Sequence, residues 1–224
     1  MQVKNPLYKD QGIHVITSIF TVIDGVTKVL LVKRKNSPFK DMWSLVGGAL
    51  YNNEDLLEGV KREMFEKTGI VNIDTYFSGV FGKKDRSPVK RMIAITYIGI
   101  IDSEKVSFLK ETLKTSNADW FAIDKIPKLA FDHNEIVKEA LKSLQENIVN
   151  TDILKALFPS GFTIPEIQRV YESILNKKFD RRNFRKKLLS IDLIQDTNKV
   201  RNFKGNKPAK VYKFKKSKIS KNVF

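Results

Sequence analysis

The stretch GALYNNEDLLEGVKREMFEKTGI, residues 48–70, decides the fold of the first half of this chain. Its glycines and charged residues keep a distinctive spacing, at Gly48, Glu54, Arg62, Glu63, Glu66 and Gly69. Residues 54–68 are expected to form a helix that Gly69 stops. Glu63 and Glu66 are three residues apart, so they lie on one face of that helix. The stretch therefore predicts a strand, a glycine-containing loop and a helix that carries clustered carboxylates.

These residue types suit the binding of a metal ion together with a phosphate ligand. Grouped carboxylates favour Mg²⁺, a hard cation that prefers oxygen ligands and is often shared with phosphates. Arg62 can hold a neighbouring carboxylate through two parallel hydrogen bonds. Gly48 allows the backbone to approach a ligand closely. The alternative is an ordinary acidic helix face, for which the glycine spacing would be a coincidence.

The spacing resembles the Nudix box, G-x5-E-x7-R-E-U-x-E-E-x-G-U, in which U is aliphatic, at every position but one. The resemblance implies a Nudix fold in residues 1–149. In Nudix hydrolases this apparatus splits a nucleoside diphosphate linked to another group, with a metal-activated water. By resemblance Gly48, Glu63 and Glu66 would hold Mg²⁺ in an active enzyme, and Glu63 would be catalytic.

Lys67 is the one departure, because it stands where the family has the second Glu of its pair. A lysine removes a metal ligand and adds a positive charge beside a dication site. We therefore expect metal-assisted hydrolysis to be weak or lost. Ligand binding should persist, since the fold, the loops and the remaining acids persist. The lysine can even supply part of the metal's charge against a pyrophosphate.

The rest of the first half indicates an α+β domain with a mixed sheet. Two runs rich in β-branched residues flank Asp24-Gly25, which predicts a β-hairpin. Asp132 and Glu135 have capping-box spacing at the start of a second helix. Further strands are expected in residues 43–48, 71–82, 91–101 and 117–124.

Composition separates the two halves of the chain. The net charge is +16, of which residues 1–150 carry +3 and residues 151–224 carry +13. A basic domain beside a nearly neutral one indicates a polyanionic partner, although a solvated basic surface is the alternative. The absence of cysteine excludes disulfide scaffolds and thiol catalysis. The sequence shows neither a secretory signal nor a membrane span, so a soluble cytoplasmic protein is expected.

The basic half, residues 150–216, has the pattern of a winged helix-turn-helix domain, and residues 217–224 are a basic tail. A short helix should stop at Pro159-Ser160-Gly161, and a second should begin at the Thr163 capping box. A third helix should begin after Asp180, with Phe184, Leu188 and Ile191 on its buried face. Two strand-like runs follow as the wing. Residues predicted to contact double-stranded DNA are Arg181, Arg182, Asn183, Arg185, Lys186, Lys199, Arg201, Lys204 and Lys207.

The two halves together resemble the NrtR-type Nudix-related transcriptional regulators. Runs that carry this resemblance include WSLVGG at residues 43–48 and FTIPEIQRVYESILNKKFDRRNFRKKLL at residues 162–189. It implies a homodimer on a palindromic operator, a nucleotide-sugar effector such as ADP-ribose, and control of NAD-cofactor or sugar metabolism genes. The residues expected to bind the effector are Arg34, Gly48, Arg62, Glu66, Arg86 and Arg91.

Two other functions remain open from the sequence. The first is an active, Mg²⁺-dependent Nudix hydrolase of the ADP-ribose pyrophosphatase type, with an accessory basic domain. The second is an RNA-binding Nudix protein.

Overall fold

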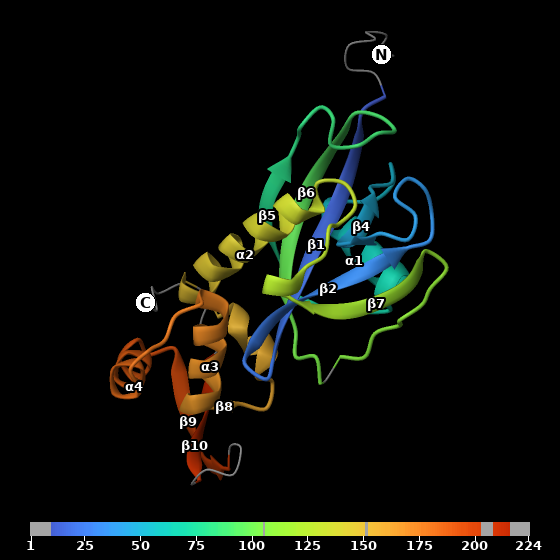
Figure 1. Cartoon of the computed structure of the whole chain (residues 1–224). Helices are drawn as coiled ribbons and strands as arrows, with labels where there is room; N and C mark the ends of the chain where they lie inside the picture. The colour runs from blue at the N-terminus through green and yellow to red at the C-terminus, as the bar shows by residue number, and fades with distance from the viewer. Residues whose placement is uncertain (1–9, 105, 151, 203–207, 216–224) are drawn as a thin grey trace. The chain divides into compact units, whose positions relative to one another are not determined.

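A computed structural model describes residues 10–104, 106–150, 152–202 and 208–215 of the chain. The chain divides into two compact units. The first unit comprises the chain through Phe20, Val29–Gly99 and Val106–Ala140. The second comprises Thr21–Lys28, Ile100–Lys105 and Leu141–Phe224. Figure 1 shows the strands of the first unit and the short helices of the second.

The predicted hairpin is confirmed. Strand β1 (Gly12–Ile23) turns at Asp24-Gly25 into β2 (Val26–Arg34). Both turn residues have positive φ, 52° at Asp24 and 78° at Gly25, which is the backbone conformation that such two-residue turns require. The centres of both strands are buried, and most of their side chains are apolar or β-branched on both faces.

Seven strands form one mixed sheet around this hairpin. The main path runs in the order β3-β2-β1-β6-β5, while β4 pairs with β1 and β7 pairs with β2. Strands β1 and β4 are antiparallel, with Val15 opposite Gly48. The remaining strands are β3 (Trp43–Ser44), β4 (Val46–Ala49), β5 (Thr75–Phe81), β6 (Met92–Ile100) and β7 (Thr115–Ala122).

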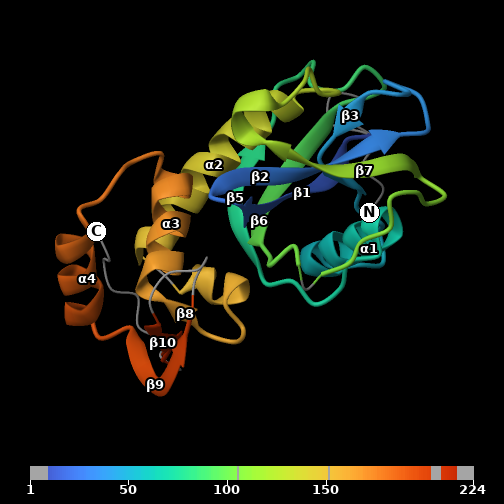
Figure 2. The same cartoon turned by 60° about the horizontal axis from the view of Figure 1, so that its bottom comes forward.

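Two helices flank this sheet. Helix α1 (Leu56–Thr68) and the first half of α2 (His133–Asn150) lie on opposite faces, as Figures 1 and 2 show together. Asp55 and Glu58 form a capping box at the start of α1, and Gly69 ends it with φ of 73°. A short 3₁₀ helix, Ile123–Lys125, follows β7. Helix α1 confirms the helix predicted for residues 54–68, and it begins two residues later than expected.

The second unit contains the predicted winged helix. It begins with a 3₁₀ helix (Ile153–Leu157) and a short strand β8 (Phe162–Thr163), followed by α3 (Ile164–Leu175) and α4 (Arg181–Ser190). Strands β9 (Ile194–Arg201) and β10 (Ala209–Phe214) form the wing, in a sheet of order β8-β10-β9.

The local signals that predicted these helices are present. Thr163 and Glu166 form the reciprocal capping box of α3, and Asn176 ends the helix in the left-handed conformation. Asp180 caps α4 by accepting a hydrogen bond from the Asn183 amide. Phe184 and Leu188 are almost fully buried, so α4 has the apolar face that the sequence predicts. Across the described ranges, none of the helices has the length and apolar character needed to span a bilayer.

Candidate functional site

Helix α1 brings three glutamates together in the first unit. Glu54 lies just before the helix, and Glu63 and Glu66 lie on it. All three carboxylates converge on the guanidinium of Arg62. The sequence predicted this gathering of acids and a bidentate contact of Arg62 with one of them, which Glu54 provides.

Arg62 uses its donors fully. Its Nε and Nη2 donate to the two oxygens of Glu54 at 2.8 and 2.6 Å. Its Nη1 donates to Glu63 at 2.6 Å and to Glu66 at 3.2 Å. Nη2 also reaches the Ala49 carbonyl at 2.8 Å, and the ring of Tyr51 lies 3.8 Å from the guanidinium carbon. Such a bidentate and stacked arrangement fits arginine but not lysine.

Lys67 enters the same cluster from the next turn of α1. Its ammonium donates to the Gly47 carbonyl, and it lies 3.3 Å from Oε2 of Glu63. The side chain of Glu63 is only 4% exposed and that of Lys67 12%. The lysine that replaces the family's second glutamate is therefore held inside the acid cluster.

Lys114, from the segment before β7, completes the arrangement. Its ammonium is 2.5 Å from Glu66 and 4.0 Å from Glu63. We call Glu54, Glu63 and Glu66 with Arg62, Lys67 and Lys114 the matched cluster, because three carboxylates face three cations. Lys114 was not singled out from the sequence, since it is 48 residues away from Glu66 and no motif includes it.

These contacts favour the charged forms of Glu54 and Glu66. Hydrogen bonds from Arg62 lower the pKa of Glu54 to about 2. The same contact with Glu54 raises the pKa of Arg62. Burial lowers the pKa of Lys67, while the neighbouring Glu63 works against that shift. Burial also raises the pKa of Glu66, but Lys114 and Arg62 outweigh it, so the net shift is downward.

Gly48 leaves the space that Glu63 occupies. A Cβ atom at this position would lie 2.4 Å from Oε1 of Glu63, far inside contact distance. A Cβ at Gly47 would similarly meet the Val15 carbonyl oxygen at 2.3 Å. The glycines predicted for close approach to a ligand thus permit close approach between β4 and an acid of α1.

The cluster as it stands does not fit a divalent cation. Within the described part of the chain, no group of three or more histidine, aspartate or glutamate side chains is arranged to hold a metal ion. The carboxylates that the family uses as ligands are already paired with arginine and lysine. Mg²⁺ would have to displace these cations from the carboxylates, in a cluster that carries no net negative charge.

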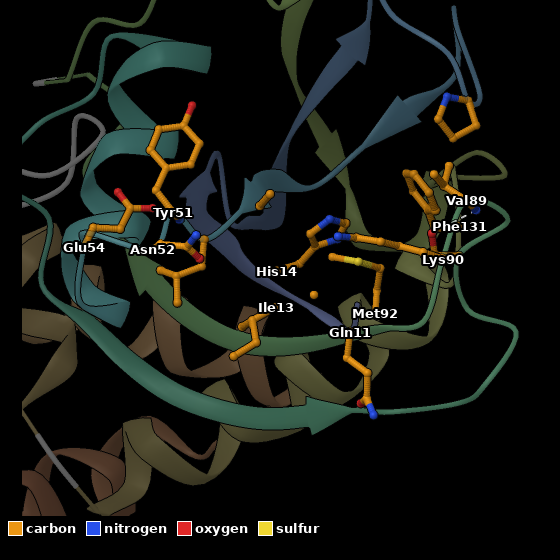
Figure 3. A pocket seen from close by; sticks show the side chains of 15 residues that line it. Gln11, Ile13, His14, Tyr51, Asn52, Glu54, Val89, Lys90, Met92 and Phe131 are labelled. Carbon is orange, nitrogen blue, oxygen red and sulfur yellow. Dashed lines mark hydrogen bonds between the residues drawn. The ribbon is translucent and has the colours of Figure 1, made fainter. Parts of the chain in front are cut away.

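A cavity of about 560 Å³ opens next to the matched cluster. Figure 3 shows Tyr51 and Glu54 on one side of it, Lys90 and Phe131 on the other, and Met92 between them. The lining is mostly apolar, with a few polar groups at the edges, as is usual for small-molecule sites. A cavity of this size is large enough for a nucleotide.

One histidine lines this cavity, and a second lies against Phe131, which also lines it. His14 lines it, and burial lowers its pKa to about 4, with the charge of Arg86 acting in the same direction. His133 is buried, and its Nδ1 accepts a hydrogen bond from the Leu45 amide at 3.0 Å. Burial lowers the pKa of His133 well below 6.5. Both side chains are therefore neutral near neutral pH, and no motif in the sequence includes either of them.

The other arginines predicted to bind the effector have different surroundings. Arg34 donates to the Pro38 carbonyl at 3.0 Å, and its guanidinium carbon lies 5.0 Å from the centre of the Phe131 ring. Arg86 is buried in a two-pronged pair with Asp132. The Nη1 of Arg91 is buried without a hydrogen-bond partner among the described residues. Pro38 and Phe131 line the cavity, but the six predicted effector residues lie outside its lining: Arg34, Gly48, Arg62, Glu66, Arg86 and Arg91.

The second unit presents a separate candidate surface for nucleic acid. The residues of α4 that were predicted to contact DNA are all exposed: Arg181, Arg182, Asn183, Arg185 and Lys186. A groove of about 470 Å³ runs between α4, the start of α3 and β10, and three of these arginines line it. An exposed basic helix backed by an apolar core is the arrangement by which recognition helices read DNA.

The wing residues that were predicted to contact DNA differ in their surroundings. Lys199 is exposed on β9. Arg201 instead donates to Glu166 at 2.6 Å and to the Gly161 carbonyl at 3.1 Å, so its charge already has an acidic partner within the unit. Lys204 and Lys207, also predicted to contact DNA, lie outside the described residues.

Comparison with known families places both units. The Nudix domain family matches residues 12–142, and the NrtR DNA-binding winged helix domain matches residues 154–214. This chain belongs to the Nudix family. It joins a Nudix domain to an NrtR winged helix, as the sequence predicted.

Three relatives match either most of the chain or a part of it. The ADPR responsive transcriptional repressor NtrR of Acinetobacter baylyi is 27% identical over 201 residues, covering 88% of this chain and 79% of the relative. The crystal structure of Shewanella oneidensis NrtR complexed with a 27mer DNA matches with a TM-score of 0.76 and 27% identity, covering 91% of this chain and 93% of that one. The ADP-ribose pyrophosphatase of Methanocaldococcus jannaschii is 35% identical over 131 residues, covering 58% of this chain and 75% of the enzyme.

Proposed function

We propose that this protein is a DNA-binding transcriptional regulator whose Nudix domain binds a nucleotide-sugar effector such as ADP-ribose. One observation carries the proposal: a single chain holds a Nudix domain with a nucleotide-sized cavity and an NrtR winged helix. A relative named for its response to ADPR and another crystallised with DNA support the two halves. Control of NAD-cofactor or sugar metabolism genes stays a prediction from the resemblance.

The cavity offers the two environments that such an effector needs. Its apolar side, with Met92 and Phe131, suits a nucleoside. Its other side, at Tyr51 and Glu54, adjoins Arg62 of the matched cluster, and positive charge there suits a diphosphate. The effector therefore places its phosphates toward α1 and its base toward Phe131.

DNA binding is assigned to α4 and the wing. Its exposed arginines pair with guanine edges or with phosphates, and Asn183 can pair with adenine. One winged helix covers few base pairs, so we include a homodimer on a palindromic operator in the proposal. We include the predicted cytoplasmic location in the proposal.

Regulation follows from differential binding. An effector that binds one state of the protein better than the other shifts the population toward that state. By linkage, DNA must then change the affinity for the effector by the same factor as the effector changes the affinity for DNA.

Fluorescence anisotropy with the full-length protein tests this proposal. The probe is duplex DNA from the region upstream of the genes that neighbour its own, with and without ADP-ribose. We expect specific binding that ADP-ribose changes, and strong salt dependence. The double variant Arg182→Ala, Arg185→Ala should lose about tenfold or more in affinity. The matched control removes two exposed charges elsewhere, Lys138→Ala with Lys142→Ala on α2, and should bind as the wild type does.

Two results would contradict the regulator. The recognition helix is wrongly assigned if the double variant binds DNA as tightly as the control does. A preference for single-stranded or duplex RNA over the DNA probe would favour the RNA-binding alternative.

An active hydrolase is the second candidate, favoured by the likeness to a pyrophosphatase and by the retained Glu63 and Glu66. Release of AMP from ADP-ribose with Mg²⁺, abolished by Glu63→Gln, would establish it. Absence of turnover across a panel of metals and nucleotide sugars would remove it.

A further inference from the structure

We propose that the ammonium of Lys67 takes the place of the divalent cation used by Nudix enzymes, so that the effector's diphosphate binds to this chain without metal. The inference rests on the proposed function and deepens it, because it states how the site meets the charge of the phosphates. It concerns the first unit alone.

The ammonium of Lys67 contacts the same kinds of oxygen atom that usually bind a metal ion. Its Nζ contacts a backbone carbonyl, that of Gly47, and a carboxylate oxygen of Glu63 at 3.3 Å. Carbonyl and carboxylate oxygens are the ligands that hard divalent cations take from proteins. An ammonium has three N–H donors, and these two contacts leave one for an oxygen of a bound phosphate.

The carboxylate of Glu63 is held tightly in place. Its carboxylate fits against Gly48, where a Cβ atom would come within 2.4 Å of Oε1, and the side chain is 4% exposed. Nη1 of Arg62 holds that same oxygen at 2.6 Å. Glu63 is thus fixed between Arg62 and Lys67, and it cannot turn toward a metal ion without breaking both contacts.

The carboxylates of the matched cluster are balanced by an equal number of cations. Glu54, Glu63 and Glu66 face the three cations Arg62, Lys67 and Lys114. A site of unpaired carboxylates attracts a dication, whereas this site already contains equal positive charge. An arriving Mg²⁺ would find no net negative charge, and it would have to displace the cations that already hold the carboxylates. An arriving diphosphate, in contrast, finds the ammonium of Lys67 fixed in position before it binds, which lowers the cost of binding.

Isothermal titration of the full-length protein with ADP-ribose tests the inference directly. One titration contains EDTA and the other contains Mg²⁺, and we expect affinities that agree within about twofold. Binding that requires Mg²⁺ would overturn the inference and leave the proposed function intact. Absence of binding in both buffers would instead overturn the proposed effector.

A second measurement needs no effector. Electron paramagnetic resonance of Mn²⁺ reports bound ion, and we expect no specific Mn²⁺ site in the wild type. Lys67→Glu should create one, and should weaken ADP-ribose binding in EDTA by about tenfold or more, the typical cost of a lost charged hydrogen bond. Lys61→Glu, an exposed position on the same helix, is the matched control and should do neither.

Lys67→Gln guards against misfolding of the charge-reversal variant. It should lose ADP-ribose affinity in EDTA without gaining a Mn²⁺ site. A wild-type Mn²⁺ site that Glu63→Gln abolishes would overturn the inference. Unchanged effector affinity in both Lys67 variants would overturn it as well.

Discussion

The guanidinium of Arg86 and the carboxylate of Asp132 form a buried, two-pronged ion pair. Nε of Arg86 lies 2.9 Å from Oδ2, and Nη2 lies 2.8 Å from Oδ1. The side chains are only 1% and 9% exposed. The pair fixes the loop between β5 and β6 to the residue that precedes α2. Because both groups are buried away from water, the attraction between them offsets the free-energy cost of removing each charge from solvent.

Replacing Asp132 should therefore destabilise the protein strongly. We expect Asp132→Asn to lower the free energy of unfolding by about 3 kcal/mol, since it leaves the charge of Arg86 buried and unpaired. The matched control is Glu135→Gln, which breaks the neighbouring pair with Lys83, whose side chains are 57% and 66% exposed. That change should cost less than about 1 kcal/mol. Urea denaturation measures both, and equal losses would contradict the argument.

Acid should destabilise the fold through the two histidines. The folded-state pKa of His14 is lowered to about 4 and that of His133 well below 6.5, in each case first by burial. Below pH 6.5 the two histidines therefore bind protons more readily in the unfolded chain than in the folded chain. The contribution of the two histidines to the free energy of unfolding is fully present above pH 6.5. It is lost progressively as the pH drops from 6.5 toward about 4.

The variant His133→Asn isolates one of these groups. Asparagine retains an acceptor for the Leu45 amide but does not titrate. We expect a shallower decline of unfolding free energy with acid than in the wild type, measured by urea denaturation across this pH range. An identical decline would show that His133 takes no part in it.

The sequence predicted what depends on neighbouring residues. The hairpin at Asp24-Gly25, the helix before Gly69 and the capping box at Thr163 all follow from signals within a few residues, and the structure confirms them. The Nudix box predicted the gathering of Glu63 and Glu66 for the same reason.

Contacts between distant residues escaped sequence reasoning. Asp132 is 46 residues from Arg86, and Lys114 is 48 from Glu66, so no spacing rule connects them. Asp132 and Glu135 were expected to cap α2 together. Their side chains pair with Arg86 and Lys83 instead, because the loop between β5 and β6 brings those cations to the helix start.

Lys199 and Arg201 should behave differently although both were predicted to contact DNA. Lys199 is exposed, so Lys199→Ala should weaken DNA binding and reduce the salt slope by about one. Arg201 is held by Glu166 at 2.6 Å, so Arg201→Ala should mainly lower the free energy of unfolding. Anisotropy at several salt concentrations and urea denaturation separate the two effects. A larger loss of DNA affinity in Arg201→Ala than in Lys199→Ala would show that Arg201 leaves Glu166 for DNA.

Gly48 should be essential for effector binding for a reason that lies in the protein, not in the ligand. The methyl group of Gly48→Ala would come within 2.4 Å of Glu63 and push that carboxylate away from Arg62 and Lys67. We expect ADP-ribose affinity to fall about tenfold or more, because the cations of the matched cluster lose their fixed positions.

The matched control for this change is Gly79→Ala on β5, where the nearest atom to an added Cβ is 3.6 Å away. It should bind ADP-ribose as the wild type does, and calorimetry measures both variants. Circular dichroism checks that each is folded. If Gly48→Ala is folded and binds normally, Glu63 can move without consequence, and the matched cluster does not position the diphosphate.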